Sequence, residues 1–495
     1  MRYRYFIAAQ LFLGLVMSYM LRTNLSVAIL AMVNNTALSA MEYPENGSAT
    51  TESQSTELCP NDNNNNDTEQ RDGPFLWDSE QRGVILGAFF YGYMVTEIPG
   101  GWLAFKFGGK WVILIGMLWT CFFTFITPLT VYLDMPLLLA IRVLEGLGEG
   151  VAFPCVHAMF AVWVPPSERS RMPAFILAGV GVGTVIAFPL SSRLCESEMG
   201  WPLVFYVFGG IGLCWCTLWF IFGASSPDSC RWVSKEERLH IKKALAQTIS
   251  EERPKFCEVP WLAILTTPSV WALWCSHFSY NWGFYSMVTS LPTYFKDILN
   301  LDIASNGIYS SLPYICFVFF AVAGGPIADF IVSKKLVTIG VMRKIMDGIG
   351  HSLPGVFLLS ATAIGCNQTA AITLMVFGVG TEGLVGAGYY ANNLDVTGRF
   401  AGVTFGVSNM LGSIAGITAP VVAGYFIVGP PSVEKWRIVF GITSGIYWFS
   451  AIFFLIFGSG ETAKWARLPT RTFEEATVEK DGNDENIPEK YTQRF

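Results

Sequence analysis

Long apolar stretches alternate with shorter polar ones along almost the whole chain. Twelve of them approach the roughly 20 residues that a helix needs to cross the hydrocarbon core of a bilayer. They lie at about residues 5–32, 84–104, 111–133, 136–163, 172–194, 201–223, 270–294, 308–330, 345–365, 370–394, 401–428 and 436–458. The pattern predicts an all-α membrane protein with twelve transmembrane helices.

Three longer polar segments divide the chain into parts. Residues 224–267 separate the first six apolar stretches from the last six. We therefore expect an N-terminal six-helix half at 1–223, a cytosolic linker, and a C-terminal six-helix half at 268–458. Residues 34–78 form a polar outer loop and residues 459–495 a cytosolic tail, and the tail is expected to be disordered because it has too few apolar side chains to form a core.

The composition fits a membrane protein and excludes several other classes. Only 14% of the residues are charged, whereas soluble proteins carry about 25%. The eleven cysteines form no CxxC pair or His/Cys cluster, so we expect no metal site. No phosphate-binding glycine loop or catalytic spacing is present. We therefore predict a monomer in membrane lipid that is not an enzyme and has no catalytic residues, no cofactor and no nucleic-acid partner.

Lysine and arginine residues predict the orientation of the helices. If the N-terminus is cytosolic, 24 of the 32 basic residues lie on the cytosolic side and 6 on the opposite side, as the positive-inside rule requires. The remaining two, Arg22 and Arg142, lie within the membrane. Acceptor sequences for N-glycosylation at Asn34, Asn46 and Asn66 fall in the outer loop, which independently favours two cytosolic termini.

The fourth apolar stretch contains three ionisable groups at membrane depth, Arg142, Glu145 and Glu149. At 100° per residue they fall within an arc of about 60°, with His157 about one turn-width to the side. Such groups usually mark a transport pathway or a proton relay. A structural ion pair would explain Arg142 and one glutamate, but one arginine neutralises only one of them, and the other then holds a proton more easily. We interpret both glutamates as proton-coupling residues and His157 as a candidate relay, with simple hydrogen bonding of the histidine as the alternative.

A weak internal repeat supports two related halves. The sequence GWLAFKFGGK at 101–110 follows the second apolar stretch, and GPIAD at 325–329 ends the eighth, at corresponding places in the two six-helix blocks. Two six-helix halves around a site at the middle of the membrane are the plan of the major facilitator fold. The first copy resembles the loop signature of that superfamily, with Phe105 in place of the usual aspartate.

Further motifs resemble the anion:cation symporter family of the same superfamily. They are RTNLSVA at 22–28, GAFFYGY at 87–93, IPGG at 98–101, RVLEGLGEG at 142–150 and FSYNW at 278–282. HFSYNW at 277–282 and SSLPY at 310–314 are most similar to the sialic acid carriers of the family. The glutamate carriers have an arginine in place of Tyr280 and a histidine in place of Leu86, so glutamate is disfavoured as a substrate. Glu382 stands where the family usually has a small neutral residue.

The resemblance implies roles for individual residues. Arg22 and Arg142 would bind the substrate anion, and Tyr91, Tyr280 and Asn281 would line the cavity. Snorkelling of Arg22 and simple packing of the aromatic side chains are the alternatives. The short N-terminus lacks the acidic dileucine signal of the sialic acid carriers, so a lysosomal or endosomal membrane and the plasma membrane both remain open.

The leading hypothesis is proton-coupled symport, by alternating access, of a small organic anion such as sialic acid or another acidic sugar or carboxylate. Sodium-coupled transport of phosphate or urate is the alternative within the family, because no residue separates sodium from protons, although the two glutamates favour protons. An anion channel or an uncoupled sensor is the alternative from a different class. The presence of Arg22, Arg142, Glu145 and Glu149 argues against a loss of coupling.

Overall fold

The computed structural model describes residues 2–34, 36–38, 72–165, 168, 171–246, 259–364 and 367–467, almost all of them in helices. The helices before the predicted linker are α1 (Tyr3–Met32), α3 (Ser79–Phe107), α4 (Gly109–Val131), α5 (Met135–Glu149), α6 (Ala152–Trp163), α7 (Arg171–Leu177), α8 (Gly179–Cys195) and α9 (Pro202–Phe222). Two short helices follow, α10 (Lys235–Ala246) and α11 (Trp261–Thr266).

The later helices form a second series of similar lengths. They are α12 (Pro268–Asp297), α13 (Ile303–Ser333), α14 (Ile339–Ala363), α15 (Gln368–Thr381), η3 (Glu382–Ala387), α16 (Tyr389–Thr397), η4 (Gly398–Phe400), α17 (Ala401–Phe426), α18 (Val433–Phe457) and η5 (Lys464–Ala466). When interrupted helices are joined into one span, the described residues are consistent with the twelve predicted spans, six on each side of the linker.

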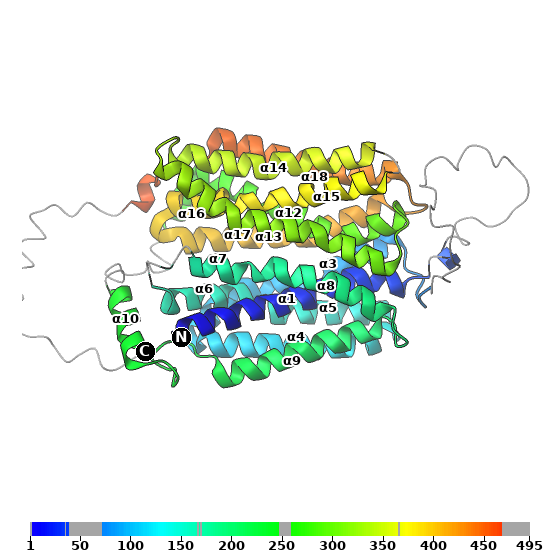
Figure 1. Ribbon diagram of the computed structural model, residues 1–495, viewed down its shortest axis with the longest axis horizontal. Helices are drawn as coiled ribbons and strands as arrows, with labels where there is room; N and C mark the ends of the chain where they lie inside the picture. The colour runs from blue at the N-terminus through cyan, green and yellow to red at the C-terminus, as the bar shows by residue number, and fades with distance from the viewer. Residues whose placement is uncertain are drawn as a thin grey trace, which may run out of the picture.

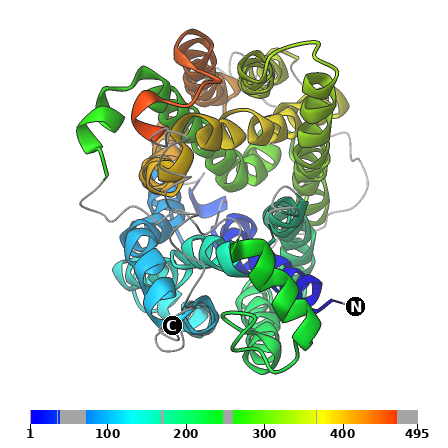
Figure 2. The same cartoon turned by 90° about the vertical axis from the view of Figure 1, so that its left-hand side faces the viewer.

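The long helices run side by side along one axis, in two groups that follow the order of the chain (Figure 1). The end-on view in Figure 2 shows the earlier helices in one group and the later helices in the other. The groups meet where α3 packs along α17 and α8 packs along α13. α1 and α12 lie at the centre of the bundle, since residues 18–30 of α1 and residues 281–295 of α12 are all buried.

Eight helices of the described chain are long and apolar enough to cross a membrane. The other four spans are α3, α5 with α6, α12 and α14, and each of them carries buried polar or charged side chains. Polar side chains lower the mean hydropathy of a span, and they are tolerated where they face the interior of a bundle. The four less apolar spans therefore carry polar side chains that face the interior of the bundle.

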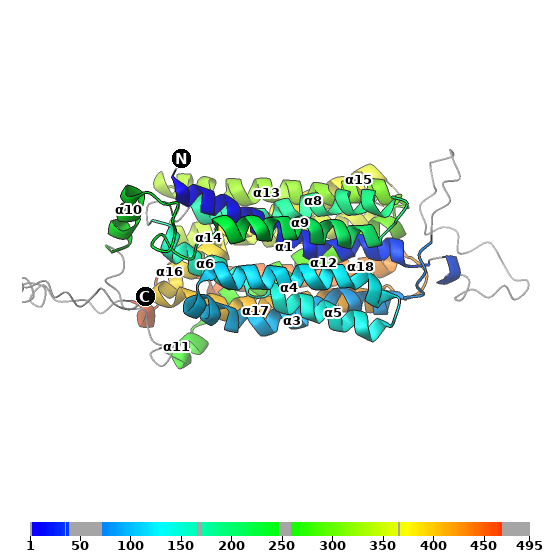
Figure 3. The same cartoon turned by 90° about the horizontal axis from the view of Figure 1, so that it is seen from below.

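The two ends of the bundle differ in what they carry. The start of α1 lies at the same end as α10, α11 and η5, as Figures 1 and 3 show. Asn34 lies at the opposite end, where its backbone N–H donates to the Phe75 oxygen at 2.8 Å and its side chain accepts from the Ala37 amide at 2.8 Å. The other two predicted glycosylation sites, Asn46 and Asn66, lie outside the described residues.

The fourth span is broken between α5 and α6 for a local reason. Pro154 lacks the N–H that would bond to the Gly150 carbonyl in a continuous helix. The regular hydrogen-bond ladder is accordingly interrupted at Gly150 and Val151, which keep right-handed helical backbone angles, and α6 starts at Ala152. The break places Glu149 at the C-terminal end of α5, in the middle of the span.

Close backbone contact between α3 and α5 fixes the position of the charged run. A methyl group at Gly146 would collide with the Phe89 carbonyl oxygen, and one at Gly92 with the Val143 carbonyl oxygen. The two helices therefore approach each other closely, as small residues allow in membrane proteins.

We expect Gly146→Ala to lower the midpoint of thermal unfolding, because the two backbones must move apart at a cost of about 1–3 kcal/mol. Gly441→Ala on α18 is the matched control, since no atom lies within 4 Å of the added carbon. The control should unfold at the wild-type temperature or slightly above it. Equal midpoints for the two variants would contradict the close contact.

Candidate functional site

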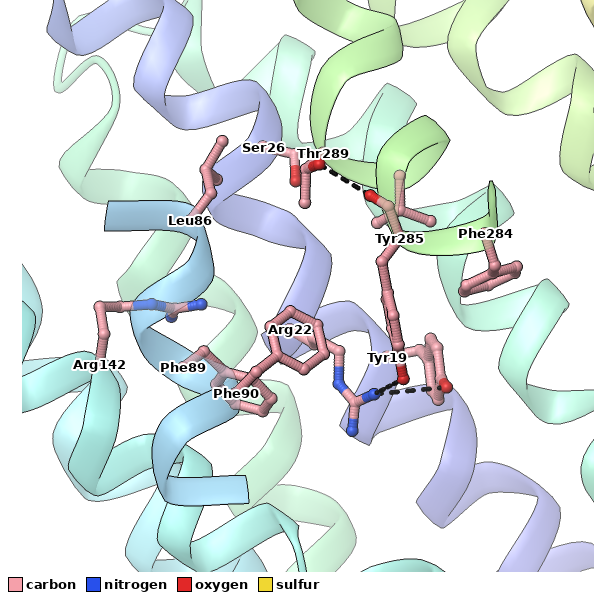
Figure 4. Close-up of a pocket in the computed structure, with 11 residues that line it drawn as sticks. Tyr19, Arg22, Ser26, Leu86, Phe89, Phe90, Arg142, Phe284, Tyr285 and Thr289 are labelled. Atoms are coloured by element: carbon pink, nitrogen blue, oxygen red, sulfur yellow. Dashed lines mark hydrogen bonds between the residues drawn. The ribbon is translucent and has the colours of Figure 1, made fainter. Parts of the chain in front are cut away.

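A cavity lies between α1, α3, α5 and α12, close to the middle of the bundle (Figure 4). Aromatic rings make up much of its wall, and two arginines are its charged side chains. It is lined by Tyr19, Arg22, Ser26, Leu86, Phe89, Phe90, Arg142, Phe284, Tyr285, Val288 and Thr289. The cavity therefore combines positive charge with flat apolar surfaces.

Arg22 forms a buried ion pair with Glu149. Its Nη2 donates to the Glu149 carboxylate at 2.6 Å and its Nε at 2.9 Å, both to the same oxygen. The Ser18 hydroxyl donates to that oxygen as well, at 2.5 Å. The other oxygen of Glu149 is buried and has no hydrogen-bond partner among the described residues. One oxygen of the Glu149 carboxylate thus accepts three hydrogen bonds, whereas the other accepts none within the described residues.

Aromatic side chains surround the guanidinium of Arg22. Its central carbon lies 4.5 Å from the ring centroid of Tyr93, 4.6 Å from that of Tyr19 and 5.1 Å from that of Phe89. Its Nη1 donates to the Tyr285 hydroxyl at 3.2 Å and to the Tyr19 hydroxyl at 3.4 Å. Cation–π contacts of this kind stabilise a buried cation by about 1–2 kcal/mol. Arg22 is therefore held by aromatic rings and tyrosine hydroxyl groups as well as by its ion pair.

Arg142 is paired with Glu145, three residues further along the same helix. The Thr127 hydroxyl on α4 donates to Glu145 at 2.8 Å, and the guanidinium of Arg142 lies 5.3 Å from the Phe89 ring centroid. The Nε of Arg142 has no hydrogen-bond partner among the described residues. Arg142 therefore has a donor to spare beside the cavity.

Each of the two glutamates is thus paired with its own arginine. The prediction that Arg142 alone would neutralise the run, leaving one glutamate without a cation, is wrong, because Arg22 reaches across from α1 to Glu149. Breaking either buried pair by removing one partner costs about 3–5 kcal/mol. An anion that enters the cavity can replace a glutamate as the partner of an arginine only if that glutamate loses its charge.

Comparisons with known proteins show which family the chain belongs to. The sequence pattern of the Major Facilitator Superfamily matches residues 11–420. Sialin from Homo sapiens is 38% identical over 469 residues, which cover 94% of this chain and 90% of sialin. A Drosophila melanogaster protein named for inorganic phosphate cotransport is 38% identical over 93% of this chain and 86% of its own length. The chain belongs to the anion:cation symporter family of the major facilitator superfamily.

A solved structure confirms the fold. The crystal structure of a bacterial homolog of the human lysosomal transporter Spinster, in an inward-facing and unoccupied conformation, superposes with a TM-score of 0.67. It covers 94% of this chain and 99% of its own at 16% sequence identity, which shows a shared fold alone. This family member is an integral multi-pass membrane protein and a secondary transporter, and it is not an enzyme.

The structure places the remaining predicted residues less centrally. Tyr91 is 50% exposed and lies on an outward stripe of α3 with Val95 and Ile98, so it does not reach the cavity. Asn281 is buried and donates to the His277 backbone oxygen at 2.9 Å. Tyr280 lies beside the cavity, with its ring 5.9 Å from that of Phe284. The expected lining role of Tyr91 is therefore wrong, and Phe89, Phe90 and Tyr93 of the same helix surround Arg22 instead.

His157 joins the two groups of helices. Its Nε2 lies 3.0 Å from the Tyr390 hydroxyl on α16, and its Nδ1 lies 2.9 Å from the Phe153 carbonyl oxygen. These partners satisfy both ring nitrogens, as the hydrogen-bonding alternative predicts. Its role as a proton relay stays a prediction.

A second contact across the groups involves Glu97 of α3. Its carboxyl group accepts hydrogen bonds from Asn409 and from Ser413 on α17, the latter at 3.0 Å. Sequence reasoning also missed Asp347 and His351, which are fully buried on α14. The criterion that singled out Arg142, an ionisable residue inside an apolar span, would have found both.

Proposed function

We propose that this protein transports a small organic anion, sialic acid or another acidic sugar or carboxylate, together with protons. The observation that carries the proposal is that Arg22 and Arg142 line one cavity while each is paired with a glutamate. Arginine suits a substrate carboxylate, since its planar fork matches the two oxygens. Glutamate suits proton coupling, since a proton removes its charge.

The coupling follows from competition for Arg22. When Glu149 is ionised, it occupies Nε and Nη2 of Arg22. A proton on Glu149 abolishes the ion pair and leaves the guanidinium available to the substrate anion. The substrate and the proton therefore favour each other's binding, and the loaded carrier changes its access from one side to the other. Arg142 and Glu145 form a second pair that can respond in the same way.

Alternating access also requires that contacts between the two groups of helices break and re-form. Glu97 with Ser413, and His157 with Tyr390, are such contacts. Both are single hydrogen bonds, which contribute about 0.5–1.5 kcal/mol between neutral partners and about 1.5–3 kcal/mol to an ionised carboxylate. Contacts of this strength hold one state without locking the carrier in it.

The proposed orientation has both termini in the cytosol, and the proposed location is a lysosomal or endosomal membrane or the plasma membrane. The distribution of basic residues supports the orientation. The similarity to human sialin supports an acidic organelle. The plasma membrane remains in the proposal as the alternative location.

The deciding experiment is uptake of labelled sialic acid into proteoliposomes that contain the purified protein. An inward proton gradient without sodium is expected to drive accumulation above the external concentration, and a sodium gradient without a proton gradient is not. Protein-free liposomes give the background. Absence of accumulation under the proton gradient would refute the proposal for this substrate.

Sodium-coupled transport of phosphate or urate is the second candidate, favoured by the Drosophila melanogaster relative named for inorganic phosphate cotransport. Either anion would also suit the two arginines of the cavity. The same proteoliposomes, given labelled phosphate or urate, distinguish the candidates. Uptake driven by sodium alone would establish the second function. Glu145 and Glu149 would then be structural residues rather than proton-coupling residues.

A further inference from the structure

A second buried polar cluster lies in the later group of helices, away from the cavity. It consists of Ser276 on α12, Asp347 and His351 on α14, Glu382 in η3 and Tyr447 on α18, and we call it the C-terminal polar cluster. Asp347, His351 and Glu382 each have an exposure of 0%. None of these five residues takes part in the cavity or in the coupling proposed above.

Hydrogen bonds and ring contacts connect the cluster. The Ser276 hydroxyl donates to Asp347 at 2.5 Å, and His351 Nδ1 lies 3.1 Å from the Asp347 backbone oxygen and 3.4 Å from its carboxylate. The His351 ring lies 5.7 Å from that of Tyr447. The Tyr447 hydroxyl donates to Glu382 at 2.9 Å. Four helical segments thus contribute to one buried cluster of two hydrogen-bonded parts, which meet where the rings of His351 and Tyr447 lie side by side.

Three atoms of the C-terminal polar cluster have no hydrogen-bond partner among the described residues. They are Asp347 Oδ2, His351 Nε2 and Glu382 Oε2. An unbonded polar atom in a protein interior costs about 1–3 kcal/mol, so its retention calls for an explanation. Oε2 of Glu382 accepts no hydrogen bond from the described residues, so a proton can add to this atom.

The burial of Glu382 without a paired cation favours a proton there. The ionisable side chains facing it are Tyr280 of α12, Tyr314 of α13, Tyr389 of α16 and Tyr447 of α18. On α14, Asp347 faces the same Tyr389, and His351 lies beside Tyr447. No arginine or lysine pairs with Glu382 within the described parts of the chain. A buried carboxylate without a cation is very costly, and binding a proton removes that cost.

Packing disfavours a metal ion at the same place. A methyl group at Gly283 would collide with the Tyr447 hydroxyl, and one at Gly388 would press on Asp347. No group of three or more His, Cys, Asp or Glu side chains in the described residues could hold a metal ion. A cation such as calcium needs about six to eight oxygen ligands, whereas a proton needs no added space.

We propose that Glu382 binds and releases a proton during the transport cycle, as a protonation site separate from Glu145 and Glu149. Tyr447 holds the carboxyl group through Oε1, and the proton adds to Oε2 from water when the cluster opens to one side. The Asp347–His351 pair supplies the ionisable groups that lie next to Glu382 and Tyr447. The proposal extends the proton coupling of the proposed function, but proton binding can be measured without any substrate.

The test is infrared difference spectroscopy of the full-length protein in lipid, with pH steps between about 5 and 8. The wild type is expected to show a C=O band of a protonated carboxylic acid that changes with pH. Glu382→Gln should lose the part of this band that arises from Glu382, whereas Glu149→Gln should keep it. The readout does not depend on the substrate, so it separates a failure here from a failure of the proposed transport function.

A second variant keeps the proposal testable if Glu382→Gln does not fold. Tyr447→Phe removes only the hydroxyl that donates to Glu382, so the band should shift to higher frequency as the C=O group loses its hydrogen bond. Three results would overturn the proposal: a pH-dependent band unchanged in both variants, a carboxylic acid band that ignores pH, or a band that responds to sodium at constant pH.

Discussion

Replacing Glu149 with glutamine is expected to abolish proton-driven accumulation of labelled sialic acid in proteoliposomes. Glutamine neither binds nor releases a proton, so it cannot alternate with the substrate as the partner of Arg22. Exchange of labelled for unlabelled sialic acid should survive, because exchange moves the loaded carrier in both directions without releasing the proton. Accumulation should fall to the level of simple equilibration across the membrane.

The control for this variant is Glu196→Gln. Glu196 also pairs with an arginine, Arg193 at 3.3 Å, but both side chains lie in the open, with exposures of 39% and 67%. Exposed pairs contribute about 0–1 kcal/mol, so accumulation should stay at the wild-type level. If Glu149→Gln still concentrates sialic acid under a proton gradient, Glu149 is not the coupling residue.

Arg22→Lys is expected to lower the initial rate of uptake about 10- to 100-fold, although the positive charge is kept. Arg22 uses Nε and Nη2 toward Glu149 and Nη1 toward Tyr285. A lysine ammonium cannot reproduce this planar fork, either with the glutamate or with a substrate carboxylate. Loss of one hydrogen bond to a charged group costs about 1.5–3 kcal/mol, and each 1.4 kcal/mol corresponds to roughly tenfold in affinity.

The comparison for Arg22→Lys is Arg193→Lys, on the exposed pair, which should transport normally. Initial rates are measured over a range of sialic acid concentrations, so that weaker binding is distinguished from slower turnover. Size-exclusion profiles of both variants show whether they fold. Normal uptake by a folded Arg22→Lys would mean that Arg22 acts only as the structural counterion of Glu149.

The length and type of each span were readable from the sequence because both depend on local properties. Twenty or so apolar residues predict a spanning helix wherever they occur. Helix ends were less accurate: the second stretch was expected at 84–104, whereas α3 runs Ser79–Phe107. Asp78 and Gln81 form a capping box at its start, a signal present in the sequence that hydrophobicity alone does not use.

The sequence singled out the buried charged residues that the structure brings together, but it did not predict that Arg22 pairs with Glu149. A glycine-rich run with ionisable groups inside an apolar span stands out in any sequence, and so Arg142, Glu145 and Glu149 could be named. Helical spacing also allowed for the pairing of Arg142 with Glu145, three residues apart. The direction in which Tyr91 points was not predictable from the family resemblance, because neighbouring residues of a helix face different sides.

The sequence by itself determined the class of this protein: a polytopic helical transporter of the anion:cation symporter family, with basic and acidic residues in the membrane. Only the tertiary structure decided that Arg22 and Glu149, 127 residues apart, form one ion pair, and that Asp347, His351, Glu382 and Tyr447 meet in a second polar cluster. The physical reason is that a spanning helix forms from its own residues and the bilayer, whereas buried charges find partners through the packing of helices distant in the chain.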